Sequence, residues 1–173
     1  MAEGAFPAAA VADAAAAAGA YLRVEADAVM ARCADAALGV AEDFCGRTWI
    51  RRTHEAVIGA GSGWQRLARA PVAGITGAVG LPAEGAPFVL PVEAYGYDID
   101  SGGVGWVRVL APGAAGRVAI SYVAGLGDWG DLPGPVATGV TLIAAHLFEH
   151  READAQPPAA VAALLRPYRQ VRL

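Results

Sequence analysis

The spacing of apolar side chains divides the chain into a helical part, a β part and a second helical part. From about Val24 to Phe44, apolar residues recur every three or four positions, and charged residues fall between them. This spacing predicts an amphipathic helix, which Gly46 ends. The Ala-rich segment before it predicts another helix, because alanine favours the helical state, Pro7 suits a first turn and Gly19 can end it.

From Thr48 onward the apolar spacing changes to two, which is typical of a β-strand. Further short β-like runs follow, and Gly or Pro turns separate them. They cover residues 64–67, 73–81, 88–92, 95–99, 106–110 and 117–124. Segment 48–125 is therefore predicted to be a compact all-β part of about six short strands.

The helical spacing returns after Pro133 and Pro135 and predicts a helix that runs to about Glu152. A short helix is expected from Ala159 to Leu165, and Pro167 stops it. A length of 173 residues suits one domain. The predicted fold class is α+β: a single domain, 1–173, with a small helical bundle from 8–46 and 133–166, a central β insertion at 48–125 and a C-terminal tail at 167–173.

Composition argues against several classes of function. The chain has 17 acidic and 13 basic residues, so it lacks the basic excess that a dedicated nucleic-acid-binding protein uses against phosphates. Mean hydropathy is +0.39, but 42 residues are Ala. No stretch offers the ~18–20 strongly apolar residues of a bilayer span. We therefore expect no membrane contact, and synthesis in the cytoplasm.

The segment Gly125–Gly130 matches the dinucleotide-binding pattern G-x-G-x-x-G. Its surroundings do not suit that function, because two prolines separate it from the next helix. Too little chain follows to build the further βαβ units that such a site needs. We interpret the segment as a Gly-rich turn that ends a strand.

His146, Glu149 and His150 match the H-x-x-E-H pattern of some zinc proteases. Zinc also needs a third protein ligand. The carboxylates downstream, Glu152 and Asp154, are too close in sequence to come from a separate packing helix. We interpret the pattern as a polar helix end, and we predict no catalytic residue, no cofactor and no metal.

Three groups of segments carry a family likeness: Tyr21-Leu-Arg-Val-Glu25 leading to Glu42-Asp-Phe-Cys-Gly-Arg-Thr-Trp49; Ile120-Ser-Tyr-Val-Ala-Gly-Leu-Gly127 with Leu132-Pro133 and Ala145-His-Leu-Phe-Glu-His-Arg-Glu152; and Leu164-Leu-Arg-Pro-Tyr-Arg-Gln-Val-Arg172. In that order and at those spacings, the chain resembles the head–tail connector, or adaptor, proteins of long-tailed bacteriophages and of phage-like gene transfer agents. The likeness covers roughly residues 22–173.

This resemblance implies a structural subunit without enzymatic activity. Such subunits form an oligomeric ring, commonly of twelve copies, in the neck of the particle. The ring surrounds the DNA channel and contacts DNA only non-specifically. Its implied partners are the portal protein on one side and a stopper or tail-completion protein on the other. The Ala-rich N-terminus and His150 depart from the usual look of the family.

The C-terminal tail is the expected partner interface, toward the portal or a neighbouring subunit. Pro167 ends the preceding helix and should free the tail, which offers the residue types that are common at interface hot spots. The candidate interface residues are Arg166, Tyr168, Arg169, Arg172 and Leu173. A frayed, solvated end is the alternative for this segment.

Two alternatives remain open for the whole chain. One is a small zinc-dependent hydrolase that uses His146, Glu149 and His150. The other is a monomeric β-type binding module, which would use segment 48–125 to accept a peptide or a glycan.

Overall fold

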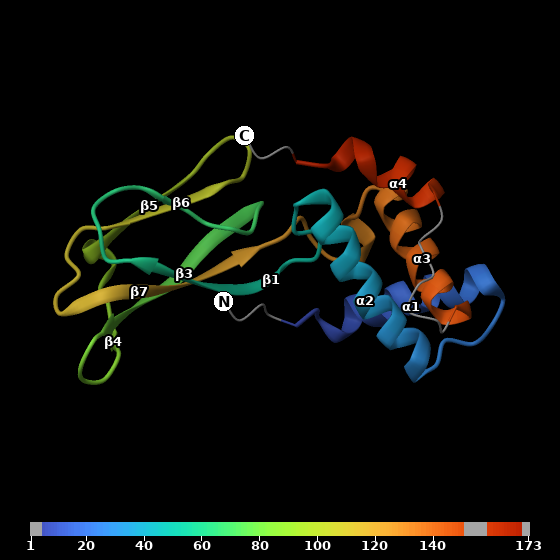
Figure 1. Ribbon diagram of the computed structural model, residues 1–173, viewed down its shortest axis with the longest axis horizontal. Helices are drawn as coiled ribbons and strands as arrows, with labels where there is room; N and C mark the ends of the chain where they lie inside the picture. Colours follow the sequence, from blue (N-terminus) through green and yellow to red (C-terminus); the bar gives the residue numbers. More distant parts are fainter. Residues whose placement is uncertain (1–4, 151–158, 171–173) are drawn as a thin grey trace. The chain divides into compact units, whose positions relative to one another are not determined.

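The computed structural model describes residues 5–150 and 159–170 of the chain. The chain divides into two compact units, each with its own cluster of buried apolar side chains (Figure 1). Among the described residues, the β unit comprises Ala5 and Arg51–Gly125, and the helical unit comprises 6–50, 126–150 and 159–170. The α+β class predicted from the sequence is confirmed, whereas the organisation as a single domain stays a prediction.

The helical unit has four described helices, and three of them pack around α3. These are α1 (Ala8–Leu22), α2 (Ala28–Cys45), α3 (Gly134–Glu149) and α4 (Ala159–Leu165), and α3 contacts the other three. Apart from Gly19, the buried positions of α1 are all alanines, so its backbone can approach α2 and α3 closely. In the same way, α4 packs on α3 at Gly139, where an added Cβ would lie 2.9 Å from Leu165.

Helix α1 does not end at Gly19 as the sequence predicted. Gly19 is buried inside the helix, which continues to Leu22 and ends at Arg23 with φ of 60°. A Cβ at position 19 would lie 2.9 Å from the carbonyl oxygen of Val24. The glycine therefore makes room for the reversing chain and is not a terminator.

Helix α2 begins later than the predicted position near Val24. Asp27 caps it, because its Oδ1 accepts hydrogen bonds from the N–H groups of Val29 and Met30 at 2.9 and 2.8 Å. At the other end, Gly46 adopts φ of 63° and closes the helix as predicted. Helix α3 is also shorter than predicted, since it ends at Glu149; residues 151–158 lie outside the described part.

The β unit contains two antiparallel sheets that pack face to face. One has the strand order β1-β7-β3-β4 and the other β2-β6-β5. Side chains from both sheets, such as Ile120, Tyr122 and Val107, fill the space between them. The strands are β1 (Arg52–Gly59), β2 (Gln65–Arg66), β3 (Val72–Pro82), β4 (Phe88–Val89), β5 (Tyr95–Ile99), β6 (Gly105–Val109) and β7 (Ala115–Ala124).

The first strand begins at Arg52, four residues after the predicted start at Thr48. Thr48, Trp49 and Ile50 are buried, and the last two belong to the core of the helical unit. The alternating spacing across this boundary misled the prediction, because a short extended segment and a strand share the same period. None of the described helices is long and apolar enough to cross a membrane.

Candidate partner interface

The C-terminal tail is anchored on the helical unit by an aromatic contact. After α4, the chain forms a single 3-10 turn, η3 (Arg166–Tyr168). The ring of Tyr168 then meets the indole of Trp49, with the ring centroids 5.9 Å apart and 78° between the planes. This near-perpendicular arrangement is one of the two that aromatic pairs prefer. Tyr168 is half-buried and Trp49 is fully buried.

Two further contacts hold the tail against the end of α2. The N–H of Gln170 donates a hydrogen bond to the carbonyl oxygen of Cys45 at 2.8 Å. The guanidinium of Arg169 lies over the ring of Phe44, 5.8 Å from its centroid. The thiol of Cys45 lies 3.7 Å from the carbonyl oxygen of Leu165, which joins the end of α4 to the same place.

The expectation that Pro167 frees the tail is therefore wrong for residues up to 170. The sequence showed a short polar segment with little apolar bulk, but it could not show that Tyr168 has Trp49 as a partner. Of the candidate interface residues, Arg166 and Arg169 are exposed and Tyr168 is half-buried. Arg172 and Leu173 lie outside the described residues.

A buried carboxylate fixes the segment against which Tyr168 packs. Glu42 is 1% exposed, and its Oε1 accepts hydrogen bonds from the N–H groups of Trp49 and Ile50 at 2.7 and 3.2 Å. A charged acceptor makes such hydrogen bonds stronger than neutral ones. On the other side, the guanidinium of Arg47 lies 5.5 Å from the centre of the Trp49 ring.

The thiol of Cys45, next to which the tail packs, has low reactivity. Burial raises the pKa of the Cys45 thiol, while the neighbouring Trp49 side chain and the charge of Arg47 lower it in part. The thiolate is the reactive form of cysteine. Cys45 is therefore held mostly as the unreactive thiol at neutral pH and serves as a packing residue.

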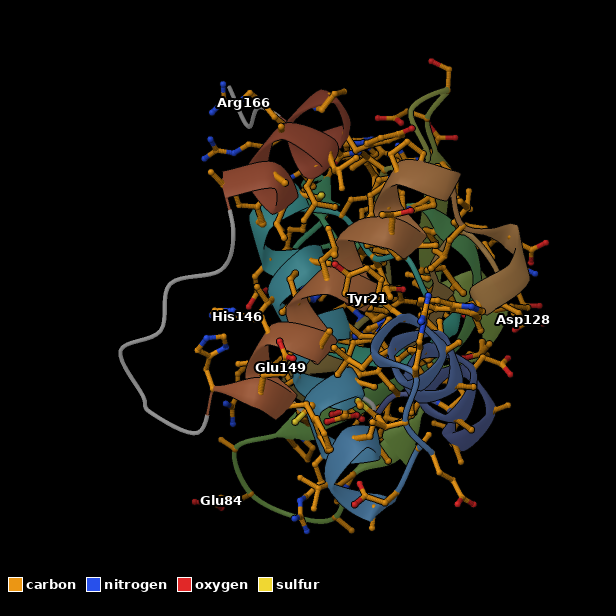
Figure 2. All side chains as sticks on the ribbon, turned by 90° about the vertical axis from the view of Figure 1, so that its right-hand side faces the viewer. Tyr21, Glu84, Asp128, His146, Glu149 and Arg166 are labelled. Carbon is orange, nitrogen blue, oxygen red and sulfur yellow. The ribbon has the colours of Figure 1, made fainter. Side chains whose placement is uncertain are left out.

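The histidines of the zinc-protease pattern stack on each other at the end of α3, where Figure 2 labels His146 and Glu149. Their ring centroids are 4.3 Å apart with 29° between the planes, and Nδ1 of His150 lies 3.1 Å from the carbonyl oxygen of His146. Glu149, on the same helix end, is exposed. Within residues 5–150 and 159–170, no group of three His, Cys, Asp or Glu side chains could hold a metal ion.

In the Gly-rich segment 125–130, the carboxylate of Asp131 occupies the place where the backbone N–H groups of the turn could otherwise bind an anion. The N–H of Asp128 donates to the Oδ2 of Asp131 at 2.9 Å, as part of a capping box at η2 (Trp129–Asp131). A Cβ at Gly127 would clash with the side chain of Asp131. A phosphate would meet this carboxylate, so the arrangement fits a tight turn and not a dinucleotide site.

A second candidate contact site lies on the β unit, and sequence analysis missed it. Trp64, Asp98 and Trp106 line an open pocket of about 320 Å³ on the three-stranded sheet. Only the strand register brings these residues together, because they come from three separate segments of the chain. The signal available in the sequence was the alternation around Trp106, between the buried Gly105 and Val107.

The fold is thus that of an α+β protein whose exposed aromatic and arginine side chains suit contacts with other proteins. A scan of protein-family models and a search of curated proteins find no match to the chain. Solved structures do match. A chain from the neck of an empty gene transfer agent (GTA) particle, computed with C6 symmetry, is 27% identical, with a TM-score of 0.75 over 99% of this chain and 95% of that one.

Two further matches come from native particles. A chain from the neck of a native GTA particle, computed with C12 symmetry, is 26% identical, with a TM-score of 0.74 over 100% of this chain and 97% of that one. A chain from the virion of a native gene transfer agent particle is 27% identical, with a TM-score of 0.70 over 98% and 94% of the two chains. These matches confirm the predicted resemblance to neck proteins of gene transfer agents.

Proposed function

We propose that this protein is a head–tail connector subunit in the neck of a phage or gene transfer agent particle. Copies of it form a ring between the portal and the stopper or tail-completion protein, around the DNA channel. The observation that carries the proposal is the match over 99% of this chain and 95% of a GTA neck chain. Because nearly the whole of both chains aligns, the likeness includes both units and is not limited to one common fold element.

Ring formation fits the symmetry of the similar structures. Two of these neck structures were computed with C6 and C12 symmetry, and a ring of twelve copies is compatible with both. The net charge of −4 also suits a channel protein. A protein that neutralised many phosphates would bind DNA tightly, whereas a channel must let DNA slide.

Within this proposal, the exposed cations at the end of the helical unit form the contact with the portal or the next subunit. The packing of Tyr168 on Trp49 holds the turn that carries Arg166 and Arg169. Both guanidinium groups are thus presented from an ordered support, which lowers the entropic cost of docking. Acidic side chains or backbone carbonyls on the partner would accept their hydrogen bonds. Arg172 and Leu173 would extend the same contact.

A structural role, without catalysis, accounts for the surfaces better than an enzyme does. The histidine rings at the end of α3 stack on each other and do not face a common point with a third ligand among the described residues. The similar structures are particle necks.

The proposal is tested with heads purified from producer cells that lack this gene. Added wild-type protein should bind at the portal vertex in about twelve copies per head and restore tail attachment, as counted by quantitative mass spectrometry and electron microscopy. The double variant Arg166→Glu, Arg169→Glu should lose binding, whereas the matched control Arg32→Glu, at a site on α2 outside this cation pair, should keep it. Wild-type protein that stays monomeric and leaves the heads unoccupied would rule out a connector.

A further inference from the structure

The outer face of the three-stranded sheet carries the open pocket lined by Trp64, Asp98 and Trp106. Cross-strand pairing places Trp106 on β6 between Arg66 on β2 and Asp98 on β5. The next residue along β6, Val107, is fully buried in the core. Side chains alternate along a strand, so Trp106 and its two neighbours point away from the core.

This pocket has the chemistry of a site for a cation. The side chain of Asp98 is exposed, and its carboxylate makes no hydrogen bond or ion pair with any described residue. Trp64 is 46% exposed, and it already holds one guanidinium, that of Arg108, 4.6 Å from its ring centre. Aromatic faces and a carboxylate together favour a flat guanidinium, which can stack and form two hydrogen bonds at once. The chain contains no lysine, so every permanently charged basic side chain in it is an arginine.

The opposite outer face of the same unit carries an apolar row, with the polar pair Glu55 and Ser121 two positions away on β1 and β7. Val57, Ala119, Val79 and Val89 pair in one continuous row across all four strands of the larger sheet. Val57 is 44% exposed and Val89 is 78% exposed. A contiguous apolar row on an outer sheet face is typical of a contact surface.

The apolar row also has a cation beside it. Arg117 lies on β7, two residues from Ala119, and pairs with Gly59 and Leu81 of the neighbouring strands. Its side chain is exposed and, among the described residues, its guanidinium makes no hydrogen bond, ion pair or ring contact. Within the described part of the β unit, one face therefore offers the guanidinium of Arg117 near valines, and the other offers the carboxylate of Asp98 in a pocket with two tryptophans.

We propose that these two faces meet between neighbouring copies of the chain. Arg117 of one copy enters the pocket of the next, where Asp98 accepts its hydrogen bonds and Trp64 and Trp106 flank it. The valine row covers the exposed parts of the tryptophan rings. This inference rests on the proposed ring, and it names the surface that closes it.

The two sheets of a sandwich turn their outer faces in opposite directions, so this contact is head-to-tail. Head-to-tail contacts produce closed rings when the rotation between copies closes, whereas a contact of like faces would stop at a dimer.

Charge reversal tests the contact. Asp98→Arg and Arg117→Asp each place like charges together in every contact, and each should lower ring assembly by roughly tenfold or more, measured as copies bound per head and as rings by native mass spectrometry. Trp64→Ala should weaken assembly in the same direction. Glu84→Arg and Arg23→Asp, at exposed sites outside both faces, are matched controls and should assemble like wild type.

Mixing the two charge variants separates a lost contact from a misfolded chain. In a 1:1 mixture, the arginine introduced at position 98 of one variant meets the aspartate introduced at position 117 of the other. The unchanged Asp98 and Arg117 meet at the next contact, so an alternating ring of even copy number should form. The double variant Asp98→Arg, Arg117→Asp should also form rings by itself. Restoration in both cases is expected only if positions 98 and 117 meet between copies.

The outcomes distinguish this inference from the proposed function. Wild-type rings together with assembly by both single variants would overturn the inference and leave the connector role standing; this is also the result expected if the pocket binds a free glycan or peptide. Single variants that fail and are not rescued by mixing would overturn it as well. Wild-type protein that forms no ring, alone or on heads, would overturn the proposed function and this inference with it.

Discussion

The rings of Tyr168 and Trp49 meet nearly at a right angle, with their centroids 5.9 Å apart. The contact joins the end of the described chain to a segment more than a hundred residues earlier. Tyr168→Ala should therefore destabilise the helical unit by about 1–3 kcal/mol, because it removes a half-buried aromatic side chain and an aromatic pair. Chemical denaturation followed by far-UV circular dichroism measures the change.

Tyr21→Ala is the matched control for this prediction. Tyr21 lies in α1 and is 60% exposed, so its loss should change the free energy of unfolding by less than about 0.5 kcal/mol. Equal effects of the two substitutions would show that the tail contact contributes no stability, and the tail would then behave as the free segment that the sequence suggested.

The carboxylate of Glu42 is expected to be the most sensitive polar group of the helical unit. Glu42→Ala leaves the buried N–H groups of Trp49 and Ile50 without their acceptor, which should cost about 2–4 kcal/mol. Glu42→Gln keeps an acceptor oxygen and should cost less. Asp35→Ala, at an exposed site on the same helix, controls for helix propensity. A Glu42→Ala protein as stable as this control would contradict the role assigned to the carboxylate.

The sequence predicted the helices and most strands because apolar spacing is a local property. The β-strand that ends at Ala124 and the helix of residues 159–165 were found in this way, and so was the helix end at Gly46. Errors arose where contacts with other segments of the chain determine where an element begins or ends. A hydrogen bond to Glu42 holds Trp49 in the helical core, so β1 begins later than predicted. Gly19 is required because the carbonyl oxygen of Val24 lies close to its Cα.

The same limit applies to the candidate site, where the sequence showed residue types but not their contacts. Aromatic and arginine side chains at the C-terminus were visible as residue types, but the partner of Tyr168 was not. The pocket on the β unit was missed because Trp64, Asp98 and Trp106 become neighbours only through the pairing of β2, β6 and β5. Register between strands depends on packing across the whole sheet, which a local pattern does not contain.

Substitution by alanine should have opposite effects on stability at two helical glycines. At Gly139 an added Cβ would lie 2.9 Å from Leu165, so Gly139→Ala should separate α4 from α3 and lower stability by about 1–3 kcal/mol. At Gly39, on α2, an added Cβ meets nothing within 4 Å. Gly39→Ala should therefore raise stability by about 0.5–1 kcal/mol through helix propensity. Thermal denaturation of the two variants checks both signs.

Acid should loosen the turn between β5 and β6 through Asp100. Its pKa lies below the ordinary value of 3.8, mainly because the backbone N–H of Val104 donates to the carboxylate; the indole of Trp106, the N–H of Gly102 and the charge of Arg66 act in the same direction. A lowered pKa means that the folded state favours the charged form. The stabilisation is therefore present above pH 3.8 and is lost as the pH falls through the lower, folded value.

Carbon-13 NMR of the Asp100 carboxyl group measures this titration directly. In Asp100→Asn, the stability of the β unit should depend less on pH in this acidic range than in wild type. Glu84→Gln, an exposed change without these contacts, should keep the wild-type dependence. A carboxyl group that titrated above 3.8 would show that the hydrogen bonds to the turn do not form in solution.

The helical unit should fold without the β unit, because the chain leaves and re-enters it at neighbouring points. Ile50 pairs with Gly127 in a parallel bridge, and the N–H of Leu126 donates to the carbonyl oxygen of Trp49 at 2.9 Å. A short Gly-Ser linker in place of residues 52–124 can therefore join the two ends at a small cost in loop-closure entropy. The shortened protein should show helical circular dichroism and one cooperative unfolding transition.

A longer excision, of residues 49–126, is the matched comparison. It removes Trp49, to which Glu42 and Tyr168 bind, so it should lose several kcal/mol more than the excision of 52–124. If both excisions unfolded completely, the helices would need the β unit to form their core.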